Sequence, residues 1–160
     1  MKTALTISIE KELVNALYKP AQWQVTPDPA QHNRRSVYLI AKRNLKLPFL
    51  EVFDAPDTLV SCPRRESSTH SPQALELLNG SLSNREAKVL AARLAAESGR
   101  SYRKQVDSAY RLAVGRAPTQ RELQVALDFL RKEAKRAGDQ KAREEFALAM
   151  FNLNAFLYVN

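Results

Sequence analysis

Signals that start and stop helices alternate along the second half of the chain, and they constrain its fold more than any other feature. Ser83 to Glu86 and Thr119 to Glu122 both fit the capping box, in which a hydroxyl residue and a glutamate three positions later satisfy free amides at a helix start. Hydrophobic residues follow each box at intervals of three and four, the spacing of one helix face. Glycines placed to end helices stand at Gly99, Gly115 and Gly138. The second half is therefore predicted to be a series of amphipathic helices.

Two further helices are predicted between and after these boxes. One begins at Ser101 and ends at Gly115, and the other is capped by Asp139 and runs toward the C-terminus. The final stretch, Phe146–Tyr158, is apolar on nearly all sides, so we expect it to be the central and most buried helix. Alanines in the middle of these helices predict that helix axes approach closely.

Prolines punctuate the first half, which is predicted to be loop-rich with short helices. Ser8–Tyr18 is predicted to form a first helix, and residues 21–33 form an ordered loop that Trp23 anchors in the core. Pro48 opens a single helical turn that ends at residues 54–57, because proline is tolerated at the first helical position.

Two more segments complete the first half. Residues 34–43 hold four consecutive apolar residues from Val37 to Ile40, which favour a strand, although a buried helical turn fits the same pattern. A helix is predicted from Ser71, with Pro72 in its first turn and Gly80 closing it.

The predicted fold is mainly α. We expect a compact bundle of about five to seven helices, preceded by a loop-rich segment with at most one or two short strands. A length of 160 residues suits one domain, with residues 1–80 as its loop-rich half and residues 81–160 as its helical half.

The chain is basic, with 25 Lys and Arg against 17 Asp and Glu and a net charge of +8. Residues 1–80 hold ten basic and eight acidic residues and residues 81–160 hold fifteen and nine, so the basic excess is mainly on the predicted helices. A surface for a polyanionic ligand is one interpretation. A solvated helical face is the favoured one, because the cations are scattered and no aromatic platforms lie between them. Nucleic acid is therefore an unlikely partner.

The N-terminus has no apolar run typical of an export signal, and no stretch approaches the ~20 apolar residues that span a membrane. As written, the polypeptide is expected to stay in the cytoplasm without inserting into a membrane.

The polar segment Ser61–Gln73 is the densest candidate for a binding site. Adjacent arginines offer planar donors to an anion, and hydroxyls at the start of the following helix add further donors. The predicted ligand-binding residues are Arg64, Arg65, Ser68, Thr69, His70 and Gln73. The alternative is a structural polar network, which irregular backbone requires. Its predicted members are Arg34, Arg35, Asp54, Asp57, Cys62 and Glu66.

No residue is assigned a catalytic or metal-binding role. Cys62 near His70 is conceivable as a nucleophile, but no cysteine-hydrolase signature surrounds it. Asp54 and Asp57 with these two residues match no zinc spacing. Gln120 and Arg121 stand where a DNA-reading helix would place its contacts, although helical hairpins are far commoner.

Six ordered motifs resemble one known family. They are Arg34–Arg43, Phe53–Asp57, Ser61–Arg65, Gln73–Asn79, Gly115–Thr119 and Phe151–Tyr158. Together, from about Leu13 to the end, they resemble the planctomycete-specific PSD-one family, a domain of unknown function (fifteen-fifty-three). The resemblance implies a secreted or periplasmic parent protein, with a cytochrome-c-type domain and another uncharacterised domain upstream. This chain has no haem attachment motif, so it is expected to be the C-terminal portion of such a parent, without a cofactor of its own.

Three functions remain open at this point. The leading expectation is a helical module that serves in structural packing or in binding a partner or ligand, with the upstream domains of the parent as partners. The second is part of an enzyme that acts on a polyanionic or sulfated carbohydrate. The third is a nucleic-acid-binding helical domain.

Overall fold

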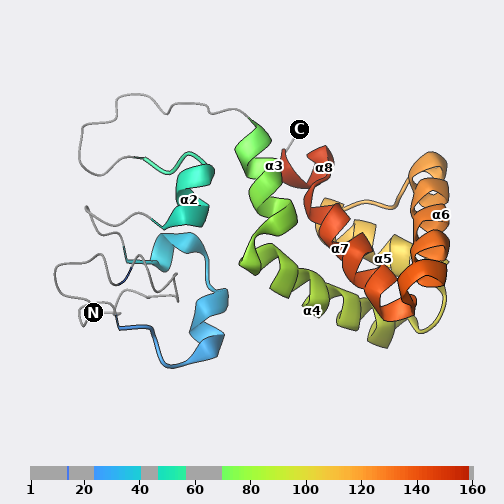
Figure 1. Cartoon of the computed structure of the whole chain (residues 1–160), viewed down its shortest axis with the longest axis horizontal. Helices are drawn as coiled ribbons and strands as arrows, with labels where there is room; N and C mark the ends of the chain where they lie inside the picture. Colours follow the sequence, from blue (N-terminus) through green and yellow to red (C-terminus); the bar gives the residue numbers. More distant parts are fainter. Residues whose placement is uncertain (1–13, 15–23, 41–46, 57–69, 159–160) are drawn as a thin grey trace. The chain divides into compact units, whose positions relative to one another are not determined.

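The computed structural model describes residues 14, 24–40, 47–56 and 70–158. These residues hold seven α-helices, α2 to α8, and two 3-10 helices, η2 and η3 (Figure 1). Within them the only extended pairing is a single bridge residue, Leu39. The prediction of a mainly α fold is therefore confirmed. The chain divides into two compact units, Met1–Ser68 and Thr69–Asn160, which are described separately.

The first unit contains short helices held by local bonds. Its described helices are η2 (Pro29–Asn33), η3 (Ser36–Tyr38) and α2 (Pro48–Val52). Asp28 caps η2, since its carboxylate accepts from the Ala30 amide at 3.0 Å. Pro48 opens α2 as predicted, and the rings of Phe49 and Phe53 lie 4.9 Å apart. The predicted helix at Ser8–Tyr18 and the anchor Trp23 lie outside the described residues, apart from Val14, which is helical.

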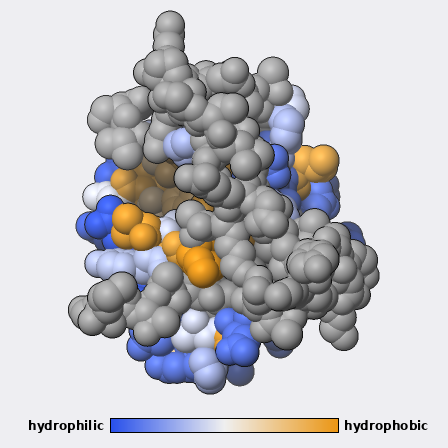
Figure 2. All heavy atoms as spheres, turned by 90° about the vertical axis from the view of Figure 1, so that its left-hand side faces the viewer, coloured by the Kyte–Doolittle hydropathy of each residue, from blue (hydrophilic) through white to orange (hydrophobic). Residues whose placement is uncertain are grey.

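The strand predicted over residues 34–43 is wrong at Ser36–Tyr38, which form η3. The amides of Tyr38 and Leu39 donate to the carbonyls of Arg35 and Ser36, both at 3.0 Å, so local bonds replace a sheet ladder. A strand of β-branched and aromatic residues gains from packing on a neighbour. Val37 is instead 76% exposed. Figure 2, which views the left-hand side of Figure 1, shows hydrophobic residues at the surface among hydrophilic ones.

The second unit is a bundle of six helices built around α7. They are α3 (His70–Asn79), α4 (Ser81–Ser98), α5 (Tyr102–Val114), α6 (Gln120–Ala137), α7 (Asp139–Phe151) and α8 (Asn154–Leu157). Helix α7 contacts each of the other five. The prediction of a central last helix is confirmed for α7, in which Phe146 and Met150 are buried.

The prediction fails beyond α7, because the helix breaks at Asn152 and Leu153 before α8. Phe156 and Tyr158 are 39% and 42% exposed rather than buried. Apolar composition on all sides therefore predicted burial for residues 152–158, none of which is buried. None of the described helices is long and apolar enough to cross a membrane.

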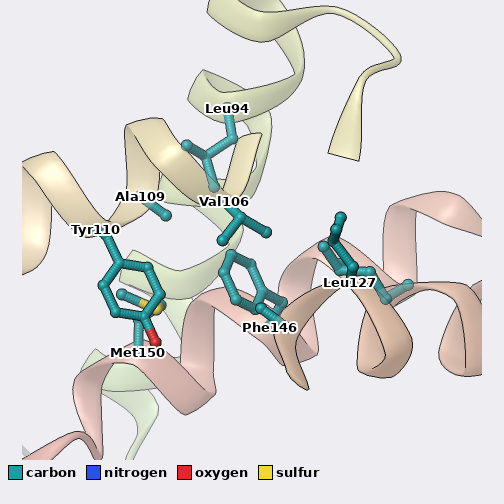
Figure 3. Packing of buried hydrophobic residues seen from close by; sticks show 10 residues of the cluster. Leu94, Val106, Ala109, Tyr110, Leu127, Phe146 and Met150 are labelled. Atoms are coloured by element: carbon teal, nitrogen blue, oxygen red, sulfur yellow. The ribbon is translucent and has the colours of Figure 1, made fainter. Parts of the chain in front are cut away.

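The main core lies where α4, α5, α6 and α7 converge. Its largest side chains include Leu94, Val106, Leu130, Phe146 and Met150, all nearly inaccessible to solvent (Figure 3). Burying one such side chain contributes roughly 1.5–3 kcal/mol. This cluster therefore supplies most of the favourable free energy of packing in the unit.

A second cluster joins α4 to α7 through small side chains. Ala87, Ala91 and Ala147 are all buried in it, with Leu148 and Phe151 packed against them. Alanine at the contact lets two helix axes approach closely. The predicted alanine-mediated packing is thus present between α4 and α7.

Helix stops were predicted better than helix starts. Gly99, Gly115 and Gly138 follow α4, α5 and α6, and all three have positive φ. Gly115 adopts the left-handed conformation that glycine reaches without a steric cost. The Thr119–Glu122 capping box is also present, with both of its hydrogen bonds.

Two predicted starts are wrong. Helix α4 begins at Ser81 rather than at Ser83, because Gly80 separates it from α3 by one residue and the Gly80 carbonyl accepts from the Asn84 amide at 3.1 Å. Ser83 is buried within the first turn instead of capping it. Asp139 does not cap α7, since its carboxylate accepts from the Tyr102 hydroxyl and Gly138 takes the cap position.

Candidate functional site

Most of the predicted ligand-binding residues lie outside the described part of the chain. These are Arg64, Arg65, Ser68 and Thr69. His70 and Gln73 lie in the first turn of α3, where Gln73 is half-buried and has an interaction of its own. The anion site at residues 61–73 therefore stays a prediction.

The predicted structural network is described in part. Asp57, Cys62 and Glu66 lie outside the described residues. The Arg34 guanidinium lies 5.2 Å from the centre of the Tyr38 ring, and Arg35 is the exposed residue before η3. Asp54 follows α2 with φ of 57°, a conformation that aspartate tolerates better than most residues.

An apolar surface lies at one end of the second unit, and it was not predicted. On α3, Leu75 and Leu78 are 63% and 46% exposed, whereas Leu77 faces inward at 6%. Residues three apart share a helix face, so the two exposed leucines lie side by side on the outer face of α3. The signal in the sequence was the run of leucines on both faces of this short helix.

Helix α8 adds aromatic side chains at the same end. The start of α4 packs on the end of α7 through Ala87 and Phe151. Helix α3, which precedes α4 and contacts α7, and α8, which follows α7, therefore both lie toward this end of the bundle. Phe156 is partly exposed, with its ring 5.4 Å from that of Phe151. We call the surface formed by Leu75, Leu78, Phe156 and Tyr158 the α3–α8 end.

A basic surface lies on the last turns of α6. Four cations and one acid line a shallow, open depression there: Asp128, Arg131, Lys132, Lys135 and Arg136. We call the four cations the α6 basic face. The prediction treated basic residues as scattered, but two adjacent pairs separated by two residues place these four on consecutive turns. That spacing was readable in the sequence.

The turn between α5 and α6 is held by an ion pair. Arg116 donates to both carboxylate oxygens of Glu122, at 2.8 and 2.7 Å, and also lies 5.9 Å from the centre of the Tyr110 ring. Glu122 also accepts from the Thr119 amide at 2.7 Å. The hydrogen bonds from Arg116 contribute most, and together with the bonds from Thr119 they lower the pKa of Glu122 from 4.5 to about 2. The carboxylate is fully committed to the turn, which is a structural role.

A second polar contact joins the starts of α5 and α7. The Tyr102 hydroxyl donates to Asp139, and partial burial together with this carboxylate raises the pKa of Tyr102. Nearby, the fully buried Gln105 donates to the Gly99 carbonyl and fixes the turn between α4 and α5. Both contacts tie together the end of the bundle that is opposite to α3 and α8.

The two residues predicted to contact DNA are exposed. Gln120 and Arg121 lie on the surface at the start of α6, so the DNA-reading hypothesis stays a prediction. Among the described residues, no three His, Cys, Asp or Glu side chains gather closely enough to hold a metal ion.

Comparison with known proteins places the chain in a family without assigning it an activity. Neither a curated protein nor a solved structure matches the chain. A family model, described as PSD1, protein of unknown function (DUF1553), matches residues 3–130. The match starts before Leu13 and ends within α6, so the motif at Phe151–Tyr158 lies beyond it. Because it covers well over half of the 160 residues, the chain belongs to the PSD1 family of proteins of unknown function (DUF1553).

Proposed function

We propose that this chain is a non-catalytic helical module of a larger exported protein and that it packs against another part of that protein through the α3–α8 end. The observation that carries the proposal is the exposure of Leu75 and Leu78 on one face of α3 while the other face is buried. Exposed apolar surface that becomes covered contributes about 25 cal/mol per Å².

The path of the chain supports this end as the docking surface. The polypeptide enters the bundle through α3, so the upstream part of the parent is tethered to α3 through residues 1–69 of this chain. A tether raises the effective concentration of the attached part, and a modest apolar surface then suffices for association. The upstream part of the parent is therefore the proposed partner.

The exported parent is proposed from the family. Resemblance to secreted or periplasmic proteins that often carry a cytochrome-c-type domain upstream supports an extracytoplasmic location. In such a parent the haem belongs to the upstream domain, and this module serves as a packing partner for that domain. Reading the genomic sequence upstream of Met1 tests this step. An in-frame export signal with a Cys-x-x-Cys-His motif is the expected result, and an in-frame stop codon directly before Met1 contradicts it.

Hydrogen exchange tests the docking surface itself. We expect the amides of α3 and α8 to exchange at least about tenfold more slowly in the intact parent than in the 160-residue chain, because docking closes the local openings that permit exchange. In the parent, Leu75→Ser with Leu78→Ser should abolish this protection.

The matched control changes two other exposed aliphatic side chains, Val89 and Val125, which are 59% and 63% exposed on α4 and α6. Substituting both with serine should leave the protection of α3 and α8 in place. Equal protection in the parent and in the chain alone, or equal loss in both double variants, would show that the α3–α8 end is not the docking surface.

A further inference from the structure

We propose that the α6 basic face binds a sulfated polysaccharide. Its four cations, Arg131, Lys132, Lys135 and Arg136, lie within six consecutive residues, a density typical of segments that bind heparin or nucleic acid. They follow the family match, which ends at residue 130.

The helix geometry turns this short segment into one compact surface. Helix α6 rises about 1.5 Å per residue, so the pair at 131–132 and the pair at 135–136 stand about 6 Å apart along the axis. All four side chains are exposed. They line the same shallow depression, which lets a linear anionic chain contact both pairs at once.

The cations are available to a ligand. Lys132 and Lys135 form no ion pair among the described residues. Arg131 and Arg136 lie 3.6 Å from Asp128 and 2.7 Å from Glu133, with their own side chains 60% and 66% exposed. The Arg131–Asp128 pair is exposed on both sides and is worth at most about 1 kcal/mol, so a sulfate can take over the Arg131 donors. Arg136 donates its Nε–H to Glu133, whose side chain is 15% exposed, and a guanidinium has four further N–H donors to offer a sulfate.

Nucleic acid fits this surface less well. DNA-reading helices present their N-terminal residues to the bases, whereas these cations lie in the last turns of α6. The nearest amide side chain, Gln124, is bound to both carboxylate oxygens of Asp128, at 2.9 and 3.0 Å. The exposed large apolar side chain on α6 is the aliphatic Val125, and the aromatic Phe129 is partly buried against the core, so α6 is a poor platform for base stacking.

The choice of polysaccharide rests on the proposed function, because sulfated polymers lie outside cells, where the exported parent would meet them. Sulfate esters keep their negative charge at all physiological pH values and accept several hydrogen bonds, which suits arginine and lysine donors. The binding itself is a property of α6 and is measured on the purified chain, so its failure is distinguishable from failure of docking at the α3–α8 end.

The test measures binding of the full chain to heparin, as the sulfated probe, by titration calorimetry at about 0.15 M salt. Lys132→Gln with Lys135→Gln should raise the Kd for heparin at least about fivefold, since two surface ion pairs with the ligand are lost. The matched control is Lys88→Gln with Lys104→Gln, which removes the same charge from exposed sites on α4 and α5. It should change the Kd less than about twofold. Lys132→Arg with Lys135→Arg should keep the affinity of the unaltered chain.

Three outcomes overturn the proposal. The first is no binding to heparin, and the second is equal weakening in the α6 variant and in its control, which would indicate net charge alone. The third is binding to random-sequence duplex DNA as tight as to heparin with the same dependence on Lys132 and Lys135. Desulfated heparin should not bind. Unchanged circular dichroism and Tm in each variant, together with a loss confined to the α6 pair, supports the proposal.

Discussion

The two ends of the helical unit differ in kind, although α7 connects them directly. The α3–α8 end exposes Leu75, Leu78 and aromatic side chains, whereas the far end carries the α6 basic face. Association through apolar side chains is not weakened by salt, and sulfate or phosphate salts strengthen it. Binding of a polyanion by cations weakens steeply as salt rises. The two proposed binding surfaces are therefore expected to respond to salt in opposite directions.

The largest expected effect tests whether the two ends depend on one core. Phe146 is buried where helices from both ends converge. Phe146→Ala should lower the free energy of unfolding by about 3–5 kcal/mol, because the site keeps a cavity. Urea titration followed by circular dichroism measures it. The control Phe156→Ala, at a partly exposed ring, should cost less than about 1.5 kcal/mol. Separate unfolding transitions for the two ends would show that they do not share one core.

A larger side chain at Ala147 tests the small-residue contact between α4 and α7. Ala147 is inaccessible to solvent between α4 and α7, while Ala149 on the same helix is exposed. Ala147→Leu should destabilise the bundle by about 1–3 kcal/mol, since extra methylenes force the two helices apart. Ala149→Leu should shift the Tm very little. Similar Tm values for the two variants would contradict close packing here.

Acid titration tests the turn between α5 and α6. The pKa of Glu122 is about 2 when folded and 4.5 ordinarily, so its carboxylate stabilises the fold above about pH 4.5 and loses that effect as pH falls toward 2. Its side chain is 30% exposed, so we expect about 1–2 kcal/mol after screening rather than the full shift. Glu122→Gln should reduce stability by that amount at pH 7 and match the unaltered chain near pH 2. A constant difference across this range would contradict the assignment.

The smallest expected effect tests whether Asp128 limits binding of heparin to the α6 basic face. Asp128 pairs with Arg131 at its edge. Asp128→Asn frees this arginine and removes a repelling charge, so heparin should bind about twofold more tightly while stability changes by less than about 0.5 kcal/mol. Calorimetric titration measures the gain. Weaker binding would indicate that Asp128 orients Arg131 for the ligand.

Local signals predicted the helical fold because they act within one turn. Thr119 and Glu122 satisfy each other's amides whatever surrounds them, and Gly115 needs no partner to adopt positive φ. The predicted cap at Ser83 failed for a local reason, because Gly80 starts the helix earlier. The predicted cap at Asp139 failed for a tertiary reason, because its carboxylate accepts from Tyr102, which is 37 residues away.

The sequence showed less of the candidate surfaces. The sequence predicted the helix that forms α3, but which of its leucines faces outward depends on where α4 and α7 lie. The paired cations of α6 were visible, and only the helix boundaries show that they share a face. The predicted anion site at residues 61–73 stays a prediction, since most of it lies outside the described residues.

The single residue between α3 and α4 gives the α3–α8 end a mechanical property. A Cβ added at Gly80 would lie 2.5 Å from the Glu76 carbonyl oxygen, so the two helices meet too closely for any side chain there. Because only Gly80 separates them, α3 and α4 have little room to move independently, and α3 also contacts α7. A side chain introduced at Gly80 should therefore displace α3, and with it Leu75 and Leu78.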